Sequence, residues 1–385
     1  MLSDEDLRRY SRQFRLPQLG IEGQERLRDS RALLLGLGGL GSPAALYLAA
    51  AGVGTLGLAE YDTVEIHNLQ RQVLFRESDA GNPKLEAAKA ALLALNSRIH
   101  CRAHPGGLTP RNAITLFREY DIVLDGSDNF ATRYLANDAA HLAGRPLIHA
   151  SVSQFRAQLT VFDTARGGPC LRCLFPGMPS PESAPPCGEA GVLGALCGVA
   201  GSWMAAEAVK ILAGFGKPLR GRLLLLDLLE GGARAIRLGR TPDCALCGKN
   251  PTIHEILPEN YARGACAHPA AREAAQDTGP GDEIDAGEAM LRAASATPPF
   301  IIDVREPDEL PLGSIPGCVN IPLSLLSARA GILPSDCDIL VVCQSGMRSQ
   351  RAVRILREHG FARAWSIRGG MNAWKTRTGK PPQTH

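Results

Sequence analysis

The sequence lacks a strong excess of charge of either sign, because 42 Lys and Arg stand against 39 Asp and Glu in 385 residues, a formal net charge of +3. This balance favours neither nucleic acid nor a membrane surface as the partner. The segment from Met1 to Tyr10 mixes acids and bases without an apolar stretch, so we expect no secretory signal and a cytoplasmic protein. The long uncharged run from Ala190 to Ala206 is rich in Gly and Ala, and we interpret it as a core helix rather than a membrane span.

The chain also lacks an internal repeat, and its length is too great for one ordinary core. Hydrophobic residues at 45% and charged residues at 21% are typical of a globular protein. We predict an α/β protein with a nucleotide-type domain over residues 1–249, a linker over 250–282 that is rich in Ala, Pro and Gly, and a smaller α/β domain over 283–385.

An apolar strand at Ala32–Leu35, a small-residue helix at Pro43–Ala51 and a strand at Thr55–Ala59 predict a βαβ unit at the start of a doubly wound sheet. A helix at 84–95 and a strand at 122–124 continue the alternation. The strand-like runs 147–151 and 158–162 have no helix between them, so we expect an antiparallel extension and hence a mixed sheet.

Gly36-Leu-Gly-Gly-Leu-Gly41 follows the first strand and contains G-x-G-x-x-G, the context in which backbone N–H groups approach a phosphate. Its glycines Gly36, Gly38, Gly39 and Gly41 are candidate nucleotide-binding residues. Asp62 lies just past the second strand, where a carboxylate accepts the hydroxyls of a ribose. NAD binding would use the same parts.

A cluster of polar and cationic residues then shifts the interpretation from hydride transfer towards ATP: Asn68, Arg71 and Gln72, followed by Lys84. Two cations near a phosphate turn suit the charge that builds up on a leaving pyrophosphate, although a solvated basic face is the alternative. Asp128 follows the fourth strand at the carboxyl edge of the sheet and is a candidate ligand of Mg²⁺, or else the cap of the next helix.

The eleven cysteines include two C-x-x-C pairs far apart in the sequence. These pairs, Cys170 with Cys173 and Cys244 with Cys247, predict one structural Zn²⁺ held by four thiolates. Cys187 lies in the loop 177–191, which is rich in Pro, Ser and Gly, and is a candidate nucleophile whose use stays open.

The motifs of the first 248 residues together resemble the molybdopterin-synthase adenylyltransferase and ThiF family, relatives of ubiquitin-activating enzymes. They are the glycine turn, Asn-Leu-Gln-Arg-Gln, Gly-Asn-Pro-Lys, Asp-Gly-Ser-Asp-Asn and the Arg12 of Arg-Tyr-Ser-Arg-Gln. The resemblance implies that the C-terminal glycine carboxylate of a small ubiquitin-like carrier ending in Gly-Gly attacks the α-phosphate of ATP. It also implies a homodimer in which Arg12 reaches the phosphates of the neighbouring subunit.

The motifs from about Glu283 to Pro382 resemble a rhodanese, or sulfurtransferase, domain: Asp-Val-Arg-Glu-Pro, Gly-Ser-Ile-Pro-Gly, Cys-Gln-Ser-Gly-Met-Arg-Ser and Arg-Gly-Gly-Met-Asn-Ala-Trp. A strand ends at Cys343 and a helix starts at once, so amides and the helix dipole stabilise an anionic sulfur there. The predicted persulfide loop consists of Cys343, Gln344, Ser345, Gly346, Met347 and Arg348.

A phosphatase would use a similar loop, but related phosphatases have one residue more between the cysteine and the arginine. Ser314 and Gln344 stand where the rhodanese family often has His and Arg, which leaves the upstream sulfur donor open. We therefore predict that the chain adenylates a ubiquitin-like sulfur carrier and then delivers sulfur to it. The alternative is a NAD-dependent oxidoreductase fused to a phosphatase-like module.

Overall fold

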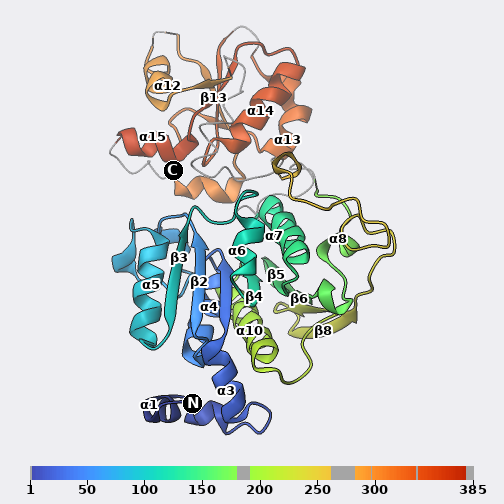
Figure 1. Cartoon of the computed structure of the whole chain (residues 1–385). Helices are drawn as coiled ribbons and strands as arrows, with labels where there is room; N and C mark the ends of the chain where they lie inside the picture. The colour runs from blue at the N-terminus through green and yellow to red at the C-terminus, as the bar shows by residue number, and fades with distance from the viewer. Residues whose placement is uncertain (1, 180–190, 262–281, 296, 335–336, 379–385) are drawn as a thin grey trace. The chain divides into compact units, whose positions relative to one another are not determined.

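A computed structural model of the chain describes residues 2–179, 191–261, 282–295, 297–334 and 337–378 (Figure 1). These residues form two compact units, Met1–Pro269 and Ala270–His385, and each has its own sheet. Residues 262–281 of the predicted linker lie outside the described part, so the proposed boundaries stay a prediction.

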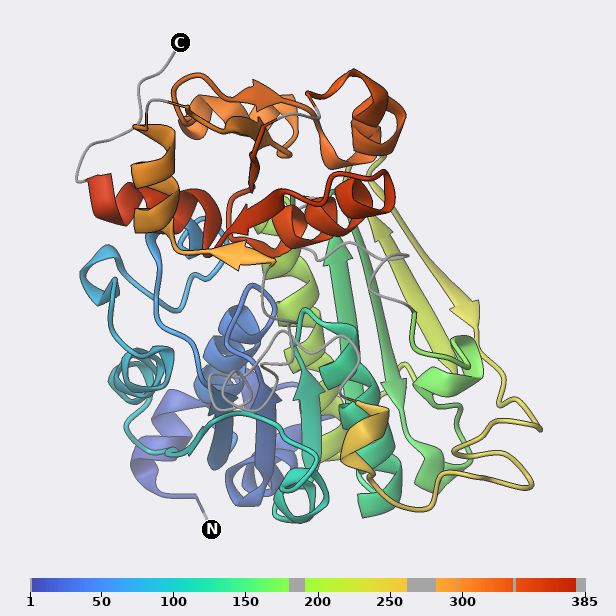
Figure 2. The same cartoon turned by 90° about the horizontal axis from the view of Figure 1, so that it is seen from above.

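The first unit is built on an eight-stranded sheet with the order β3-β2-β1-β4-β5-β6-β7-β8. The strands are β1 (Arg31–Leu35), β2 (Thr55–Glu60), β3 (His100–Pro105), β4 (Ile122–Asp125), β5 (Leu147–Ser153), β6 (Arg156–Phe162), β7 (Arg222–Asp227) and β8 (Gly232–Arg237). Pairing is parallel from β3 to β5 and antiparallel from β5 to β8, the green to yellow arrows of Figure 2. The predicted mixed sheet is confirmed.

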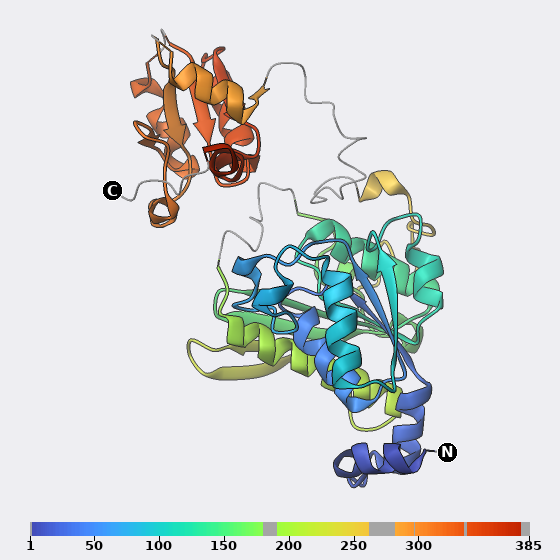
Figure 3. The ribbon, with the colours of Figure 1, turned by 90° about the vertical axis from the view of Figure 1, so that its left-hand side faces the viewer.

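The helices of the first unit cover both faces of this sheet. They are α1 (Asp4–Arg9), α2 (Ser11–Phe14), α3 (Gly20–Asp29), α4 (Gly41–Ala51), α5 (Lys84–Leu95), α6 (Ala113–Arg118), α7 (Phe130–Ala143), α8 (Leu171–Leu174) and α10 (Gly194–Ala213). Helices α4, α5 and α10 pack on one face, as Figure 3 shows, and α6 and α7 pack on the other.

Strand β1 explains why the sheet needs two layers of helices. Its side chains alternate between faces, so Leu34 lies in the core under α4 and α10, while Leu33 and Leu35 lie in the core under α6 and α7. All three are at most 2% exposed. A strand that is apolar on both faces is stable only between two covering layers, which is the arrangement of a doubly wound sheet.

Helix α10 is the described helix that is long and apolar enough to cross a membrane by length and composition alone. In the first unit it instead packs against α3, α4 and β5. Its residues Ala200, Met204 and Ala208 are fully buried in the core. Together these contacts make α10 a core helix of this unit.

The second unit contains a five-stranded parallel sheet with the order β11-β10-β12-β13-β9. Its elements are β9 (Glu283–Ile284), α12 (Ala286–Ala293), β10 (Phe300–Asp303), the 3-10 helix η5 (Pro307–Leu312), β11 (Val319–Asn320), α13 (Leu323–Arg329), β12 (Ile339–Val342), α14 (Met347–Glu358), β13 (Ala364–Ile367) and α15 (Gly370–Thr378). Helix α14 begins at Met347, directly after Gly346, which adopts a φ of +98° and reverses the chain there.

Candidate functional site

The glycine turn joins the end of β1 to the start of α4. Gly36 has a φ of +79°, a left-handed conformation that disfavours side chains. A Cβ atom at Gly41 would lie 2.0 Å from the carbonyl oxygen of Gly36, so only glycine fits there. The turn therefore places glycine backbone at the beginning of a helix, a position that favours an anion such as phosphate.

A cavity of about 510 Å³ opens beside this turn. The predicted nucleotide-binding residues in its lining are Gly36, Gly38, Gly39, Asp62, Asn68, Arg71, Lys84 and Asp128. They come from separate segments and meet where the parallel strands end, the usual ligand position of an open α/β sheet. Its volume falls within the range of small-molecule and cofactor pockets.

Two of the cations that line this cavity, Lys84 and Arg71, lie in different environments. The ammonium nitrogen of Lys84 is 3.1 Å from a carboxylate oxygen of Asp62, and the lysine side chain is buried while that of Asp62 is 57% exposed. Arg71 donates from Nη1 to the carbonyl oxygen of His67 at 3.2 Å. Because both cations are held by local partners, the cavity carries positive charge at defined positions.

Asp128 lies in the loop between β4 and α7, and its side chain is exposed. The cap of α7 is the next residue, Asn129, whose Oδ1 accepts from the backbone N–H of Thr132 at 2.9 Å. Asp128 is therefore not the helix cap that the sequence left open as an alternative, and it is one of the residues that line the cavity.

A buried pair under this loop was missed by the sequence analysis. The Nδ1–H of His149 on β5 donates to Asp125 at 2.8 Å, and the same carboxylate accepts from the backbone N–H and the hydroxyl of Ser127. Burial alone would raise the pKa of Asp125, but these hydrogen bonds and the charge of Arg133 hold it below its usual value. The ionised Asp125 thus fixes the backbone that carries Asp128.

The two C-x-x-C pairs meet in a separate cluster of the first unit. The sulfur of Cys170 is 3.9 Å from that of Cys173 and 3.5 Å from that of Cys244, and the sulfurs of Cys173 and Cys247 are 3.4 Å apart. Tetrahedral Zn²⁺ with bonds of about 2.3 Å would separate its sulfurs by about 3.8 Å. The spacing and the donor set therefore fit zinc.

In the second unit, Cys343 follows β12 and is 1% exposed. Its sulfur accepts from the backbone N–H of Gly346 at 3.2 Å and from that of Ser349 at 3.4 Å. Both donors belong to the first turn of α14 or its cap, so amides and helix dipole act together on one sulfur atom. This arrangement stabilises a thiolate or a persulfide anion.

The other members of the predicted loop differ in their exposure and in their contacts. Ser345 and Met347 are exposed, whereas Gln344 donates from Nε2 to Asn372 at 2.5 Å. Arg348 pairs with Glu309, which the sequence analysis did not single out. The loop is thus tied to α15 on one side and to η5 on the other.

The family model described as the ThiF family matches residues 10–246, more than half of the chain. The chain belongs to the ThiF family. A second model, described as a rhodanese-like domain, matches residues 285–377.

Relatives of this ThiF-family protein align with nearly the whole chain. The probable adenylyltransferase/sulfurtransferase MoeZ of Mycobacterium tuberculosis is 41% identical over 378 residues, 97% of this chain and 94% of that protein. The adenylyltransferase and sulfurtransferase MOCS3 of Bos taurus is 43% identical over an alignment of 394 residues, 97% of this chain and 86% of that protein. Among solved structures, E. coli MccB with ATP has a TM-score of 0.54 and 27% identity over 62% of this chain and 74% of its own.

These comparisons confirm the predicted family and enzyme class, an adenylyltransferase joined to a sulfurtransferase. The alternative of a NAD-dependent oxidoreductase fused to a phosphatase-like module is not supported. Both matched domains coincide with the sites described above, since the cavity lies within 10–246 and Cys343 within 285–377.

Two predicted residues of this ThiF-family protein, Gly41 and Arg12, do not line its cavity, and a third lies outside the described residues. Gly41 shapes the turn from the first residue of α4 without lining the cavity. Arg12 is exposed on α2 and does not line the cavity of its own chain. Cys187 lies outside the described residues, so its role stays a prediction.

Glu60 is a further residue that the sequence analysis missed in favour of Asp62. It ends β2, is 5% exposed, and accepts from the backbone N–H groups of Leu37, Tyr61 and Asp62 at 2.8, 2.8 and 3.1 Å. An acidic residue at the very end of the second strand was the available signal. Because all three of these contacts are to backbone, Glu60 shapes the turn, and Asp62 remains in the lining of the cavity.

Proposed function

We propose that this protein adenylates the C-terminal carboxylate of a small ubiquitin-like sulfur carrier ending in Gly-Gly and then converts it to a thiocarboxylate with sulfur carried on Cys343. The observation that carries the proposal is the cavity of about 510 Å³, where the glycine turn, Arg71, Lys84 and Asp128 converge. A glycine turn alone suits any nucleotide. Two cations and a carboxylate beside it suit the transfer of a nucleotidyl group.

In the first reaction, a carboxylate oxygen of the carrier attacks the α-phosphorus of ATP, and the bond to the bridging oxygen breaks as pyrophosphate leaves. Asn68, Arg71 and Lys84 would offset the negative charge that moves onto the pyrophosphate. Asp62 would accept the ribose hydroxyls, because its side chain is largely exposed at the cavity wall. The product is an acyl adenylate.

Mg²⁺ belongs to the proposal through Asp128, whose exposed carboxylate lines the cavity and does not cap α7. Carboxylate oxygen is the ligand type that Mg²⁺ prefers. When bound, the ion would supply positive charge to the phosphates. The Asp125–His149 pair would keep the loop in place for this contact.

In the second reaction, the outer sulfur of a persulfide on Cys343 attacks the acyl carbon and AMP leaves, which joins carrier and enzyme through an acyl disulfide. A thiol then attacks the Cys343 sulfur, so that the carrier departs as a thiocarboxylate and a disulfide remains on the enzyme. Two further thiols, or one dithiol, reduce this disulfide and are themselves oxidised to a disulfide. The role of Cys187, the candidate nucleophile of the first domain, stays open.

The homodimer and the structural zinc complete the proposal. Arg12 points to a shared site, because it is exposed and lies away from its own cavity. A second copy would also cover an apolar hollow of about 860 Å³ between α4 and α10, where Tyr47 is 59% and Val199 41% exposed.

Zn²⁺ in the four-cysteine cluster would tie residues near 170 to residues near 247. The cytoplasmic location stays a prediction.

The test is to mix the enzyme with ATP, Mg²⁺, a persulfide donor and candidate carriers, and to follow the carriers by mass spectrometry. We expect one carrier to exchange a terminal oxygen for sulfur, and pyrophosphate exchange into ATP to depend on that carrier. The control is the same carrier without its last glycine. Absence of carrier-dependent exchange with every ubiquitin-like carrier of the source genome would overturn the proposal.

A further inference from the structure

The Cys343 loop carries an ion pair that has no role in the reactions above. Arg348 donates from Nη1 to one carboxylate oxygen of Glu309 at 2.6 Å and from Nη2 to the other at 2.7 Å. The two side chains are 15% and 27% exposed. A two-point contact of this kind is among the stronger ion pairs in proteins and fixes the plane of the guanidinium.

A second guanidinium in contact with the loop is also paired. Arg305 is fully buried and donates to both oxygens of Asp303, to the carbonyl oxygen of Gly313 and to Oε1 of Gln344. Arg305 and Arg348 are therefore each paired with one carboxylate. The sulfur itself is met by neutral donors, the backbone N–H groups of Gly346 and Ser349.

This charge pattern bears on the sulfur donor. A tetrahedral dianion such as thiosulfate needs positive charge to offset the cost of leaving water, and arginine meets such groups through two parallel N–H donors. In this loop the two donors of Arg348 already bind Glu309. A donor whose transferable sulfur is terminal and carries at most one negative charge has no such requirement.

We propose that Glu309 determines the specificity of the Cys343 loop: by occupying Arg348 it makes the loop accept sulfur from a persulfide, R–S–SH, in preference to a dianionic oxyanion donor. This inference rests on the proposed sulfur-carrying role of Cys343 and names the chemical class of the donor that supplies it.

The proposed step balances without an oxidant or a reductant. The Cys343 thiolate attacks the outer sulfur of R–S–SH, a new S–S bond forms, and the donor's S–S bond breaks. The donor leaves as the thiolate R–S⁻, and the proton stays on the transferred sulfur. Upstream of this protein there must therefore be a reaction that builds persulfides on a thiol.

The first experiment measures the charge preference of the loop directly. The purified full chain is alkylated with neutral iodoacetamide or anionic iodoacetate, and the modification rate of the Cys343 peptide is read by mass spectrometry. In the wild type, the ratio of the iodoacetate rate to the iodoacetamide rate should be lower at Cys343 than at a small free thiol. In Glu309→Gln, Arg348 loses its carboxylate partner and can bind the carboxylate of iodoacetate instead. The ratio of the iodoacetate rate to the iodoacetamide rate should then rise about tenfold.

Matched variants separate the ion pair from other causes. Glu358→Gln removes the same charge from an exposed position on α14 and should leave the ratio unchanged. Adding Arg348→Ala to Glu309→Gln should cancel the rise, because the guanidinium that binds the anion is then absent. An unchanged iodoacetamide rate in Glu309→Gln shows that the loop itself is intact.

The second experiment loads Cys343 with sulfur from glutathione persulfide or from thiosulfate and measures bound persulfide. The wild type should load mainly from the persulfide, and Glu309→Gln should gain loading from thiosulfate, with sulfite released. Equal use of both donors by the wild type, or a ratio that ignores Glu309, would overturn the inference. Neither assay contains ATP or a carrier, so a failure of the adenylation proposal would appear separately.

Discussion

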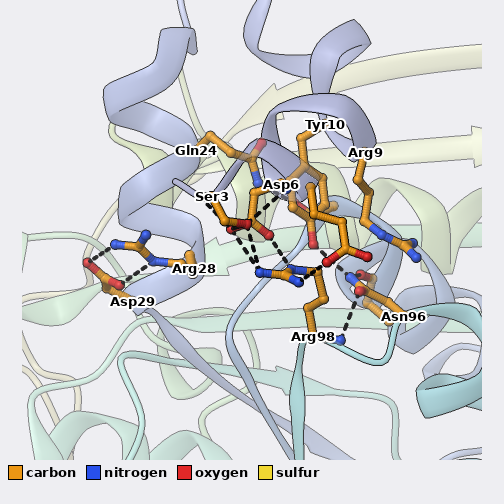
Figure 4. Close-up of polar contacts among 12 residues, drawn as sticks. Ser3, Asp6, Arg9, Tyr10, Gln24, Arg28, Asp29, Asn96 and Arg98 are labelled. Atoms are coloured by element: carbon orange, nitrogen blue, oxygen red, sulfur yellow. Dashed lines mark hydrogen bonds and ion pairs between the residues drawn. The ribbon is translucent and has the colours of Figure 1, made fainter. Parts of the chain in front are cut away.

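Arg98 anchors the N-terminal helix of the first unit, and removing its charge gives a prediction that can be worked out from the structure. Figure 4 shows Arg98 between Ser3 and Asp6: its guanidinium bonds both oxygens of Asp6, donates to the hydroxyl of Ser3 at 2.8 Å and meets Glu5 at 2.7 Å. Helix α1 directly precedes α2, which carries Arg12. Arg98→Met should therefore let α1 open more often.

The size of the effect follows from Asp6, which is 6% exposed. Burial alone would raise its pKa, but hydrogen bonds from Arg98 and Ser3 lower the pKa of Asp6 to about 2 from 3.8. That difference corresponds to at most about 2.5 kcal/mol. Since Arg98 is 32% exposed and Ser3 keeps its share, solvent screening leaves about 1 kcal/mol of this difference to be lost at Asp6.

Hydrogen exchange of the α1 amides measures this opening. The amides of Leu7 and Tyr10 bond to the carbonyl oxygens of Ser3 and Asp6, so their exchange requires the helix to open. A loss of about 1 kcal/mol should speed their exchange in Arg98→Met about fivefold at pH 7. Because the pKa of Asp6 is lowered in the folded chain, the difference from the wild type should persist above about pH 4 and vanish as the pH falls towards 2.

Arg28→Met is the matched control. Its pair with Asp29, also in Figure 4, joins adjacent residues whose side chains are 35% and 68% exposed, and it bridges no separate elements. We expect unchanged exchange in α1. Equal acceleration in both variants would show that net charge rather than the Asp6 contact is responsible, and no acceleration in Arg98→Met would refute the reasoning.

Three further predictions test the proposed chemistry. Cys343→Ala should abolish thiocarboxylate formation while carrier-dependent pyrophosphate exchange continues, because the persulfide acts after the adenylate; equal loss of both in parallel assays would contradict the two-site division. Asp128→Ala should lower pyrophosphate exchange by at least about a hundredfold. Co-refolding this variant with Arg12→Ala should restore about a quarter of wild-type exchange if each site uses Arg12 of the partner subunit. No gain over the separate variants would exclude a shared site. Cys244→Ser should release zinc and destabilise the first unit, by elemental analysis and thermal unfolding; a zinc-free wild type would remove the metal from the proposal.

The amino-acid sequence by itself predicted the family of each domain and the mixed sheet of the first unit. Short motifs suffice where function depends on backbone shape and on residue type. A side chain would clash at Gly41, and the left-handed backbone at Gly36 disfavours other residues, so both glycines can be recognised from the sequence. The C-x-x-C pairs are readable because zinc fixes the spacing within each pair. The mixed sheet follows from the change in hydrophobic pattern after β4.

Only the tertiary structure decided which side chains pair across the fold. Three contacts join residues from different elements: the hydrogen bond between His149 and Asp125, the one from the glycine turn to Glu60, and the ion pair between Glu309 and Arg348. No local pattern encodes such partners, because each depends on strand order and register. The structure also showed that Asn129 rather than Asp128 caps α7. The sequence could not distinguish them, because the two residues have the same capping propensity and only the backbone angles of the folded loop decide which one caps the helix.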